Sequence, residues 1–419
     1  MACGFAAGAW LGAAEAPAKL VTTGLSPFLI SLGMVAGVFA GRWTLPAVLK
    51  GTGFVFADIR RRYHLLVWAI LAGGLWAVAN TLTVFAIRDV GLSIAFPLWN
   101  VNSLVGVLWG VIFFRELRGA GRDTWMKVGG GALAIVIGAV LLGYASSHGV
   151  SLAPRPLSGI AAALGAALLW GTMYIPYRKA YLSGMNPLSF VTVFTVGEVF
   201  TVTILAVIFE GGWRPLGEAL AVARPSLFWL FLGGLCWVIG DLFQQYAAKY
   251  VGIGRGIPLS NTNQLWGLAW GALVFGELAG SQAGVRVMVL LGSGIMIAGA
   301  IAIAAAAAPS EEHASRSLAV ARECDRYGLD AGEVEAALAG VSHDPAADPE
   351  AGAAIKPLRS RTGDVLIAAA ALGIFVWLGA SAKRPALAVS AGWIVVLGIA
   401  TLAVLAAAGY LLWKRTRFA

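Results

Sequence analysis

The chain contains an internal repeat that lies inside two apolar segments. PLWNVNSLVG at 97–106 and PLSNTNQLWG at 258–267 share six positions and lie 161 residues apart. Each continues through a Trp-Gly pair to a Phe-x-Glu-Leu sequence, which ends at Leu117 in one case and Leu278 in the other. Such a doublet is typical of membrane proteins built from two related halves. The repeat therefore predicts a helical membrane protein with internal pseudo-symmetry.

The composition places most of the chain in lipid. The sequence is 59% hydrophobic and 12% charged, about half the charged fraction of a soluble domain. A membrane helix needs roughly 20 apolar residues. Eleven segments meet this requirement: 26–49, 63–87, 92–114, 125–145, 157–177, 187–209, 227–250, 257–275, 285–306, 364–382 and 387–413.

The net charge of +9 is explained by membrane topology, and no nucleic-acid partner is expected. Connectors after odd-numbered segments, with their flanking residues, hold 21 Lys and Arg, whereas the N-terminal tail and the even connectors hold eight. Because cytoplasmic loops are rich in Lys and Arg, we expect a multi-pass protein of a bacterial inner membrane. The C-terminus is then cytoplasmic and the N-terminus outside.

The two repeats are predicted to differ in length. Residues 157–306 hold five segments and residues 26–145 hold four, after an N-terminal tail over 1–25. Gly41-x4-Pro46 resembles Gly171-x4-Pro176 at an offset of 130, which is 31 residues short of the repeat offset. That difference is about one helix plus a turn. The prediction is an inverted repeat whose first half is one helix short.

Two further parts follow the repeats. Residues 307–363 form a more polar, cytoplasmic insert with two short predicted helices, which could bind a cytoplasmic partner or lie on the lipid surface. Residues 364–413 form a transmembrane hairpin of two helices. The fold class predicted is an all-α polytopic bundle with this C-terminal hairpin.

The repeated motif supplies the first candidate binding residues. Asn100 and Asn102 in the first copy correspond to Asn261 and Asn263 in the second. Because residues at i and i+2 of a helix do not share a face, one Asn of each pair is expected to face a central cavity. The other would hold a neighbouring helix. For any single Asn, helix–helix bonding is an equal alternative.

Two carboxyl groups lie deep inside apolar segments. Glu198 and Asp241 are expected to line a cavity or to carry a coupling proton, because an ionised carboxylate in lipid costs several kcal/mol. A salt bridge, with Arg42 as a possible partner, is the structural alternative.

Aromatic and amide side chains accompany these polar groups. Gln244 follows Asp241 on the same predicted helix, and the indoles of Trp99, Trp170 and Trp266 lie close to the motifs in sequence. Indole faces beside amides suit a sugar-like solute, whose C–H patches stack while its hydroxyls form hydrogen bonds. Packing or an interfacial belt is the alternative for any one Trp.

No catalytic constellation is present in the sequence. The four histidines and three cysteines lack metal-ligand spacing, and the glycine-rich stretches lack the Lys and Ser or Thr of a phosphate loop. We therefore expect no enzyme activity, no cofactor and no metal.

The chain resembles the drug/metabolite transporter superfamily, and within it the glucose/ribose porter family of bacterial sugar permeases. The resemblance is carried by residues 26–306, in particular by LLWGTMYIPYRK (168–179), GVLWGVIFFREL (106–117) and GLAWGALVFGEL (267–278). It implies ten helices in two inverted repeats, a central site, alternating access and proton-coupled uptake of a monosaccharide. The short first repeat, the insert and the terminal hairpin depart from that pattern.

Together these observations predict a secondary transporter of a monosaccharide or polyol, in contact with membrane lipid and a coupling proton. An exporter of amino acids or other metabolites would have the same fold. A non-transporting receptor or scaffold that uses the insert is the second alternative. The oligomeric state is not predicted.

Overall fold

The computed structural model is helical throughout the part of the chain that it describes. These residues are 2–22, 24–114, 117, 120–148, 155–251, 257, 259–306, 309–332, 334–335, 361–383 and 387–416. The helices are α1 (Ala2–Lys19), α2 (Pro27–Leu49), α3 (Thr52–Arg61), α4 (Leu66–Val90), α5 (Leu92–Trp99), α6 (Asn102–Trp109), α7 (Arg122–His148), α8 (Pro156–Leu182), α9 (Pro187–Phe209), α10 (Trp213–Val251), α12 (Asn263–Ala269), α13 (Ala283–Ala304), α14 (Pro309–Tyr327), α17 (Arg361–Ser381) and α18 (Ala391–Thr416). The all-α class is confirmed.

Ten helical segments among the described residues are long and apolar enough to cross a membrane. They coincide with ten of the eleven predicted segments. The remaining one, 257–275, contains the short helix α12 followed by a π-helical turn, Trp270–Val274, and Pro258 lies outside the described residues. The chain is a multi-pass membrane protein.

The prediction of an N-terminal tail is wrong for residues 2–19. They form α1, whose side chains are mostly buried and which packs along α10 and α12. The close approach depends on Gly4, Gly8 and Gly12, which face Leu259, Thr262 and Trp266 in turn. Small residues every four positions let two membrane helices touch through their backbones. The Ala- and Gly-rich composition that lowers the hydropathy of α1 is thus what its packing requires.

Helix α1 packs on the second motif in the same way that α8 packs on the first motif. A Cβ on Gly12 would lie 3.0 Å from the carbonyl oxygen of Asn263, and a Cβ on Gly171 would lie 2.8 Å from that of Asn102. Gly12 begins a Gly-x4-Pro sequence ending at Pro17, as Gly171 begins one ending at Pro176. In its helix contacts, the Gly-x4-Pro sequence of α1 corresponds to that of α8.

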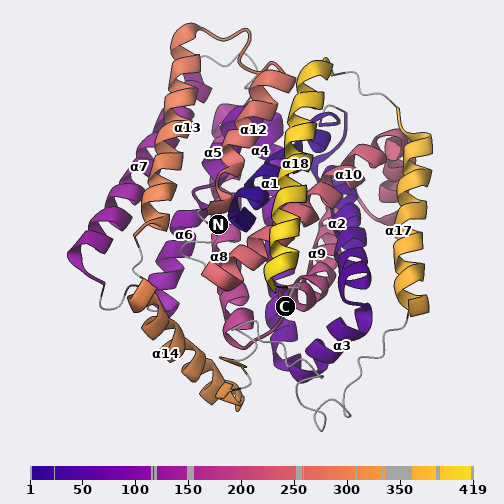
Figure 1. Cartoon of the computed structure of the whole chain (residues 1–419). Helices are drawn as coiled ribbons and strands as arrows, with labels where there is room; N and C mark the ends of the chain where they lie inside the picture. Colours follow the sequence, from indigo (N-terminus) through magenta and orange to yellow (C-terminus); the bar gives the residue numbers. More distant parts are fainter. Residues whose placement is uncertain are drawn as a thin grey trace.

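Helix packing follows the same twofold pattern. Helix α1 packs along α10 and α4 packs along α8, while α7 and α13 lie side by side at one edge of the molecule (Figure 1). Glycines make the next crossings: a Cβ on Gly37 would meet the backbone of Phe231 across α2 and α10, and one on Gly73 would meet that of Phe194 across α4 and α9. The bundle is held by backbone contact as well as by side chains.

The first motif helix is interrupted where the asparagines lie. Helix α5 ends at Trp99, α6 begins at Asn102, and Gly110–Phe114 form a π-helical turn. Pro97 lies near the end of α5, where its missing amide removes one backbone hydrogen bond from the helix. The second motif is built alike, with α12 beginning at Asn263 and its own π-helical turn.

The C-terminal hairpin lies on the outside of the bundle. Helix α17 packs on α2 and α10, and α18 packs on α1 and the π-helical turn of the second motif. Asp364 anchors α17 by accepting hydrogen bonds from the amide and hydroxyl of Thr52, at 2.8 and 2.7 Å.

Helix α14 of the insert docks on the bundle. Lys179 on α8 forms an ion pair with Glu323 at 3.2 Å, and the indole N–H of Trp68 donates to the hydroxyl of Tyr327 at 3.3 Å. The ring of Tyr327 also packs on His64, with 4.3 Å between centroids. Helix α14 therefore bridges the start of α4, in the first repeat, and α8, in the second.

Apolar packing accompanies these polar contacts. Val320 and Cys324 of α14 are buried in a small cluster with Phe114 and Leu182. Burial and the neighbouring carboxylates, Asp325 first, raise the pKa of the Cys324 thiol. The amphipathic face of α14 is thus covered by protein.

We expect Val320→Glu to release α14 and expose Cys324. A carboxylate buried among the apolar side chains of this cluster is desolvated, and undocking relieves that cost. In a Cys3→Ala, Cys236→Ala background, maleimide should label Cys324 faster in Val320→Glu than in the parent. Leu318→Glu is the matched control, since Leu318 on the same helix is exposed. Equal labelling rates for the two variants would contradict the docked arrangement.

Candidate functional site

A polar cavity lies between α1, the two motif helices, α8 and α10. Its lining residues are Leu11, Glu15, Phe96, Trp99, Asn100, Asn102, Trp170, Met173, Tyr174, Trp237, Gln244, Asn261 and Asn263. The volume of the cavity is about 40 Å³. That is room for about three waters. The cavity is therefore small in this structure.

Several lining side chains carry buried polar atoms that have no hydrogen-bond partner among the described residues. They include Asn102 Oδ1, Asn261 Nδ2, Asn263 Oδ1 and Trp170 Nε1. An unpaired buried polar group costs about 1–3 kcal/mol, so several around one cavity point to a bound polar partner. The unpaired set contains both donors and acceptors, which matches a hydroxyl-bearing solute.

Two of the lining amides are instead held by the protein. Asn100 Nδ2 donates to the carbonyl oxygen of Phe96 at 2.8 Å, and Gln244 Nε2 donates to Ser260 Oγ at 2.7 Å. The Asn100 bond satisfies a carbonyl near the end of α5. These two bonds fix the positions of the amides at the cavity wall.

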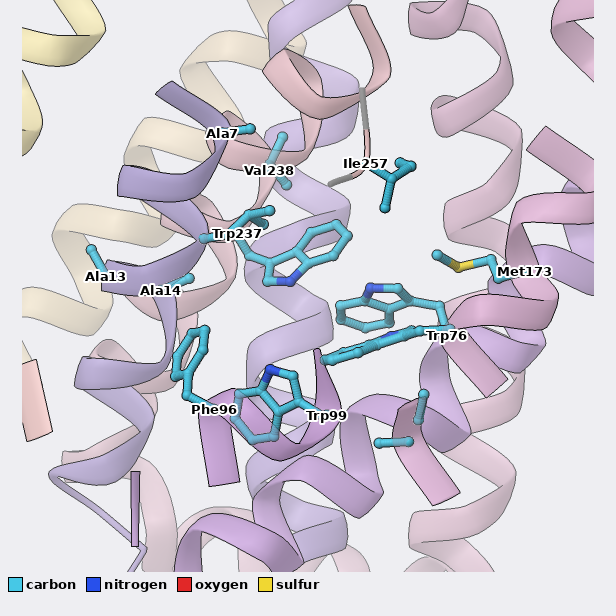
Figure 2. Packing of buried hydrophobic residues seen from close by; sticks show 14 of the residues in the cluster. Ala7, Ala13, Ala14, Trp76, Phe96, Trp99, Met173, Trp237, Val238 and Ile257 are labelled. Atoms are coloured by element: carbon cyan, nitrogen blue, oxygen red, sulfur yellow. The ribbon is translucent and has the colours of Figure 1, made fainter. Parts of the chain in front are cut away.

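Indole rings form the apolar part of the wall. Trp99 and Trp170 meet edge to face with 5.9 Å between centroids, and Phe96 lies beside Trp99 at 4.7 Å. Trp76 and Trp237 form a second edge-to-face pair at 4.7 Å. Figure 2 shows Trp76, Trp99 and Trp237 converging from different helices. The aromatic surface comes from both halves of the chain.

Most of the predicted binding residues are brought together in this wall. Asn100, Asn102, Asn261, Asn263, Gln244, Trp99 and Trp170 all line the cavity. Trp266 is not among the lining residues, and its Cβ lies against Gly12. The expectation that only one Asn of each pair faces the cavity is wrong, because the helix is interrupted between Asn100 and Asn102 and the i, i+2 rule no longer holds there.

Sequence reasoning missed Glu15. Its side chain is 2% exposed, lines the cavity, and leaves Oε2 without a hydrogen-bond partner. The residue lies between Gly12 and Pro17, in the Gly-x4-Pro sequence of α1. In an alignment of that sequence with Gly171-x4-Pro176 of α8, Glu15 corresponds to Tyr174, which also lines the cavity.

Glu198 and Asp241 lie behind the cavity wall, in an ion cluster with Arg42. Arg42 Nη2 is 2.8 Å from Asp241 Oδ2, and Nη1 is 3.6 Å from Glu198 Oε1; all three side chains are buried. The guanidinium packs over the rings of Phe194 and Trp237 at 4.3 and 5.2 Å. The salt-bridge alternative for the two carboxylates is thus the observed arrangement, and neither lines the cavity.

The cluster continues through a relay of hydrogen bonds. Gln245 Nε2 donates to Asp241 Oδ1 at 2.7 Å, and the hydroxyl of Tyr181 donates to Gln245 Oε1. The relay links α8 to α10 and satisfies the second oxygen of Asp241. Together with the ion pairs of Arg42, the relay ties α2 and α9 to α8 and α10.

The Phe-x-Glu-Leu part of the repeat has a structural role in its second copy. Glu277 accepts hydrogen bonds from the amides of Leu92 and Ser93, at 2.8 and 2.7 Å, and pairs with Lys19 at 3.2 Å. A carboxylate at a helix N-terminus satisfies amides that have no partner within the helix. Glu277 thereby joins α5 to the end of α1. The corresponding Glu116 lies outside the described residues.

Two family models match the chain in adjacent parts. The model described as "Sugar transport protein" matches residues 44–159, and the "EamA-like transporter family" model matches residues 157–305. The boundary between the matches falls at the start of α8. Together the matches cover most of the bundle other than α1 and the C-terminal hairpin.

Curated bacterial proteins are similar over parts of the chain. A Streptococcus agalactiae protein named for sugar uptake is 29% identical over 79 residues, 19% of this chain and 27% of its own. A Listeria monocytogenes protein of the same kind of name is 23% identical over 54% of this chain and 74% of its own. The Staphylococcus xylosus "Glucose uptake protein GlcU" is 22% identical over 51% and 69%. The first of these matches thus spans about a quarter of its relative.

The matches confirm the resemblance to the drug/metabolite transporter superfamily and, within it, to sugar transporters. The chain is a multi-pass membrane protein whose residues 157–305 are similar to the EamA-like transporter family and whose residues 44–159 are similar to sugar transport proteins.

Proposed function

We propose that the protein is a secondary transporter that moves a monosaccharide or polyol across the bacterial inner membrane. The observation that carries this proposal is the set of buried, unpaired amide atoms of Asn102, Asn261 and Asn263 around a cavity walled by Trp99 and Trp170. Sugar hydroxyls would pair with the amides, while C–H patches would pack on the indoles. The names of the similar proteins support the same substrate class.

The small volume of the cavity supports alternating access as part of the proposal. A monosaccharide is several times larger than the roughly three waters that the cavity could hold, so loading requires a wider state. The two motif helices are interrupted beside the cavity, at Asn100 and before Asn263. In transporters such interruptions lie at the substrate site between repeats. We propose that relative movement of the two repeats opens the cavity to either side in turn.

The same proposal includes an orientation. Figure 1 shows α3, with Arg60 and Arg61 in its last turn, at the same end of the molecule as α14. The positive-inside rule assigns that end to the cytoplasm. Because α2 ends next to α3, the start of α2 and the end of α1 belong at the outer end, and Figure 1 places the N-terminus inside the bundle.

Proton coupling through Glu198 or Asp241 was predicted from their depth in the membrane. Arg42 hydrogen-bonds Asp241 at 2.8 Å and lies 3.6 Å from Glu198, so it places a positive charge beside both buried carboxyl groups. We propose that the cluster is chiefly a structural tie between α2, α9 and α10, and that the proton is carried elsewhere.

A thermal-shift screen with monosaccharides, polyols and amino acids tests the substrate class. A solute that binds only the folded state raises the melting temperature by mass action. We expect a shift with a sugar or polyol that is lost in Trp99→Ala and kept in Trp266→Ala, since Trp266 does not line the cavity. A shift with amino acids alone would replace the proposal with a metabolite exporter. Loss of the sugar shift in Trp266→Ala but not in Trp99→Ala would refute the site.

A further inference from the structure

We infer that Glu15 is the residue whose protonation is coupled to sugar binding, an assignment that rests on the proposed function. Glu15 is the carboxyl group among the residues that line the cavity. It therefore lies where a solute in the cavity can touch it, whereas Glu198 and Asp241 lie behind the wall formed in part by Trp237.

The charge balance around Glu15 favours a proton. Among the described residues, no cation forms an ion pair with Glu15, and its Oε2 has no hydrogen-bond partner. Lys19, one turn further along α1, is engaged by Glu277 at 3.2 Å. An isolated buried carboxylate is expensive, so the small cavity favours the neutral acid.

Among the ionisable groups on the helices around α1, Tyr174 of α8 lines the cavity together with Glu15. The others lie outside the cavity lining. On α4, Arg88 and Asp89 pair with each other, and on α10, Asp241 pairs with Arg42. The remaining charged or titratable side chains on α10 and α18 are Arg214, Glu218, Arg224, Cys236, Tyr246, Lys249, Tyr410, Lys414 and Arg415. None of them lines the cavity.

The coupling step is a single proton transfer. The Glu15 carboxylate takes one proton from water on the outer side when the cavity is open there. The neutral carboxyl then donates a hydrogen bond from its O–H to a sugar hydroxyl oxygen and accepts one from a sugar O–H on its other oxygen. When the cavity opens to the cytoplasm and the sugar leaves, water solvates the carboxylate and takes up the proton. One proton crosses with one sugar.

The test compares two modes of transport in proteoliposomes. Counterflow of labelled sugar needs no net proton movement, whereas accumulation driven by an imposed pH gradient does. We expect Glu15→Gln to slow counterflow, through its altered hydrogen bonding, and to abolish gradient-driven accumulation. Asp89→Asn is the matched control, because Asp89 is a buried carboxylate on α4 that does not line the cavity. It should keep both modes.

Each outcome separates this inference from the proposed function. Wild-type protein without counterflow of any sugar or polyol would overturn the proposed function. Counterflow with pH-driven accumulation retained in Glu15→Gln, or lost only in Glu198→Gln, would overturn the assignment of Glu15 alone. Should Glu15→Gln fail to fold, a pH dye in unbuffered wild-type protein replaces it. At a pH alkaline enough to ionise Glu15 in the sugar-free protein, sugar addition must take up protons, and an unchanged dye signal would overturn the inference.

Discussion

Arg42→Met is expected to lower the stability of the folded protein by about 3–5 kcal/mol, the usual cost of removing one partner from a buried ion pair. The variant leaves Glu198 and Asp241 buried without the cation that lies 3.6 and 2.8 Å from them. It also removes the cation from the rings of Phe194 and Trp237. Thermal unfolding of the purified protein, followed by aggregation or by thiol exposure, measures the loss.

Two comparisons separate charge from packing. Lys127→Met removes a cation from a pair with Asp123 in which both side chains are well exposed, and it should cost about 0–1 kcal/mol. Adding Glu198→Gln and Asp241→Asn to Arg42→Met should recover much of the loss, because no uncompensated charge remains buried. Equal stability of Arg42→Met and Lys127→Met would show that the cluster is not a structural tie.

Gly12→Val is expected to separate α1 from the second motif helix and to abolish sugar binding. The added Cβ would meet the Cβ of Trp266 and would lie 3.0 Å from the carbonyl oxygen of Asn263. Overpacking costs about 1–3 kcal/mol, and a backbone atom cannot move aside as a side chain can. The shift displaces Asn263 from the cavity wall. Melting temperature and sugar-induced thermal shift measure the two effects.

Gly130→Val is the matched control for Gly12→Val. Gly130 also lies within a membrane helix, α7, but a Cβ there meets open space. Its stability and sugar response should resemble those of the wild type. If Gly12→Val behaved like Gly130→Val, residues 2–19 would not pack as the structure has them.

The internal repeat is the reason that the sequence predicts both the helical class and many of the residues that line the cavity. The repeat marks the same positions in both halves, so Asn100 with Asn261 and Asn102 with Asn263 could be singled out without knowledge of helix contacts. Their actual orientation could not be predicted, because it depends on where the helix is interrupted. Regular helical geometry then assigned one Asn of each pair to the wrong surroundings.

Helix α1 was missed because hydropathy measures transfer to lipid, not packing on protein. Gly4, Gly8 and Gly12 lower the apolar character of the segment while enabling its contact with α12. The charged Glu15 and Lys19 lower it further, although one lines the cavity and the other pairs with Glu277. A Gly-x4-Pro comparison that included residues 12–17 would have recovered both the helix and Glu15.

Docking of α14 changes how the insert is interpreted. Its apolar residues already pack on Phe114 and Leu182, and Glu323 is paired with Lys179. A surface covered in this way is not free to recruit a partner while the helix stays docked. Binding of a cytoplasmic protein to the insert, predicted as one alternative, would require α14 to leave the bundle first.

Sugar counterflow in proteoliposomes tests the central claim most directly, with wild-type protein compared with the Asn102→Ala, Asn263→Ala double variant. Each lost hydrogen bond is worth about 0.5–1.5 kcal/mol, so the pair should weaken transport by about tenfold or more. The account predicts saturable counterflow of a monosaccharide or polyol in the wild type and this loss in the variant. Counterflow of a sugar at wild-type rate and affinity in the well-folded double variant would contradict it.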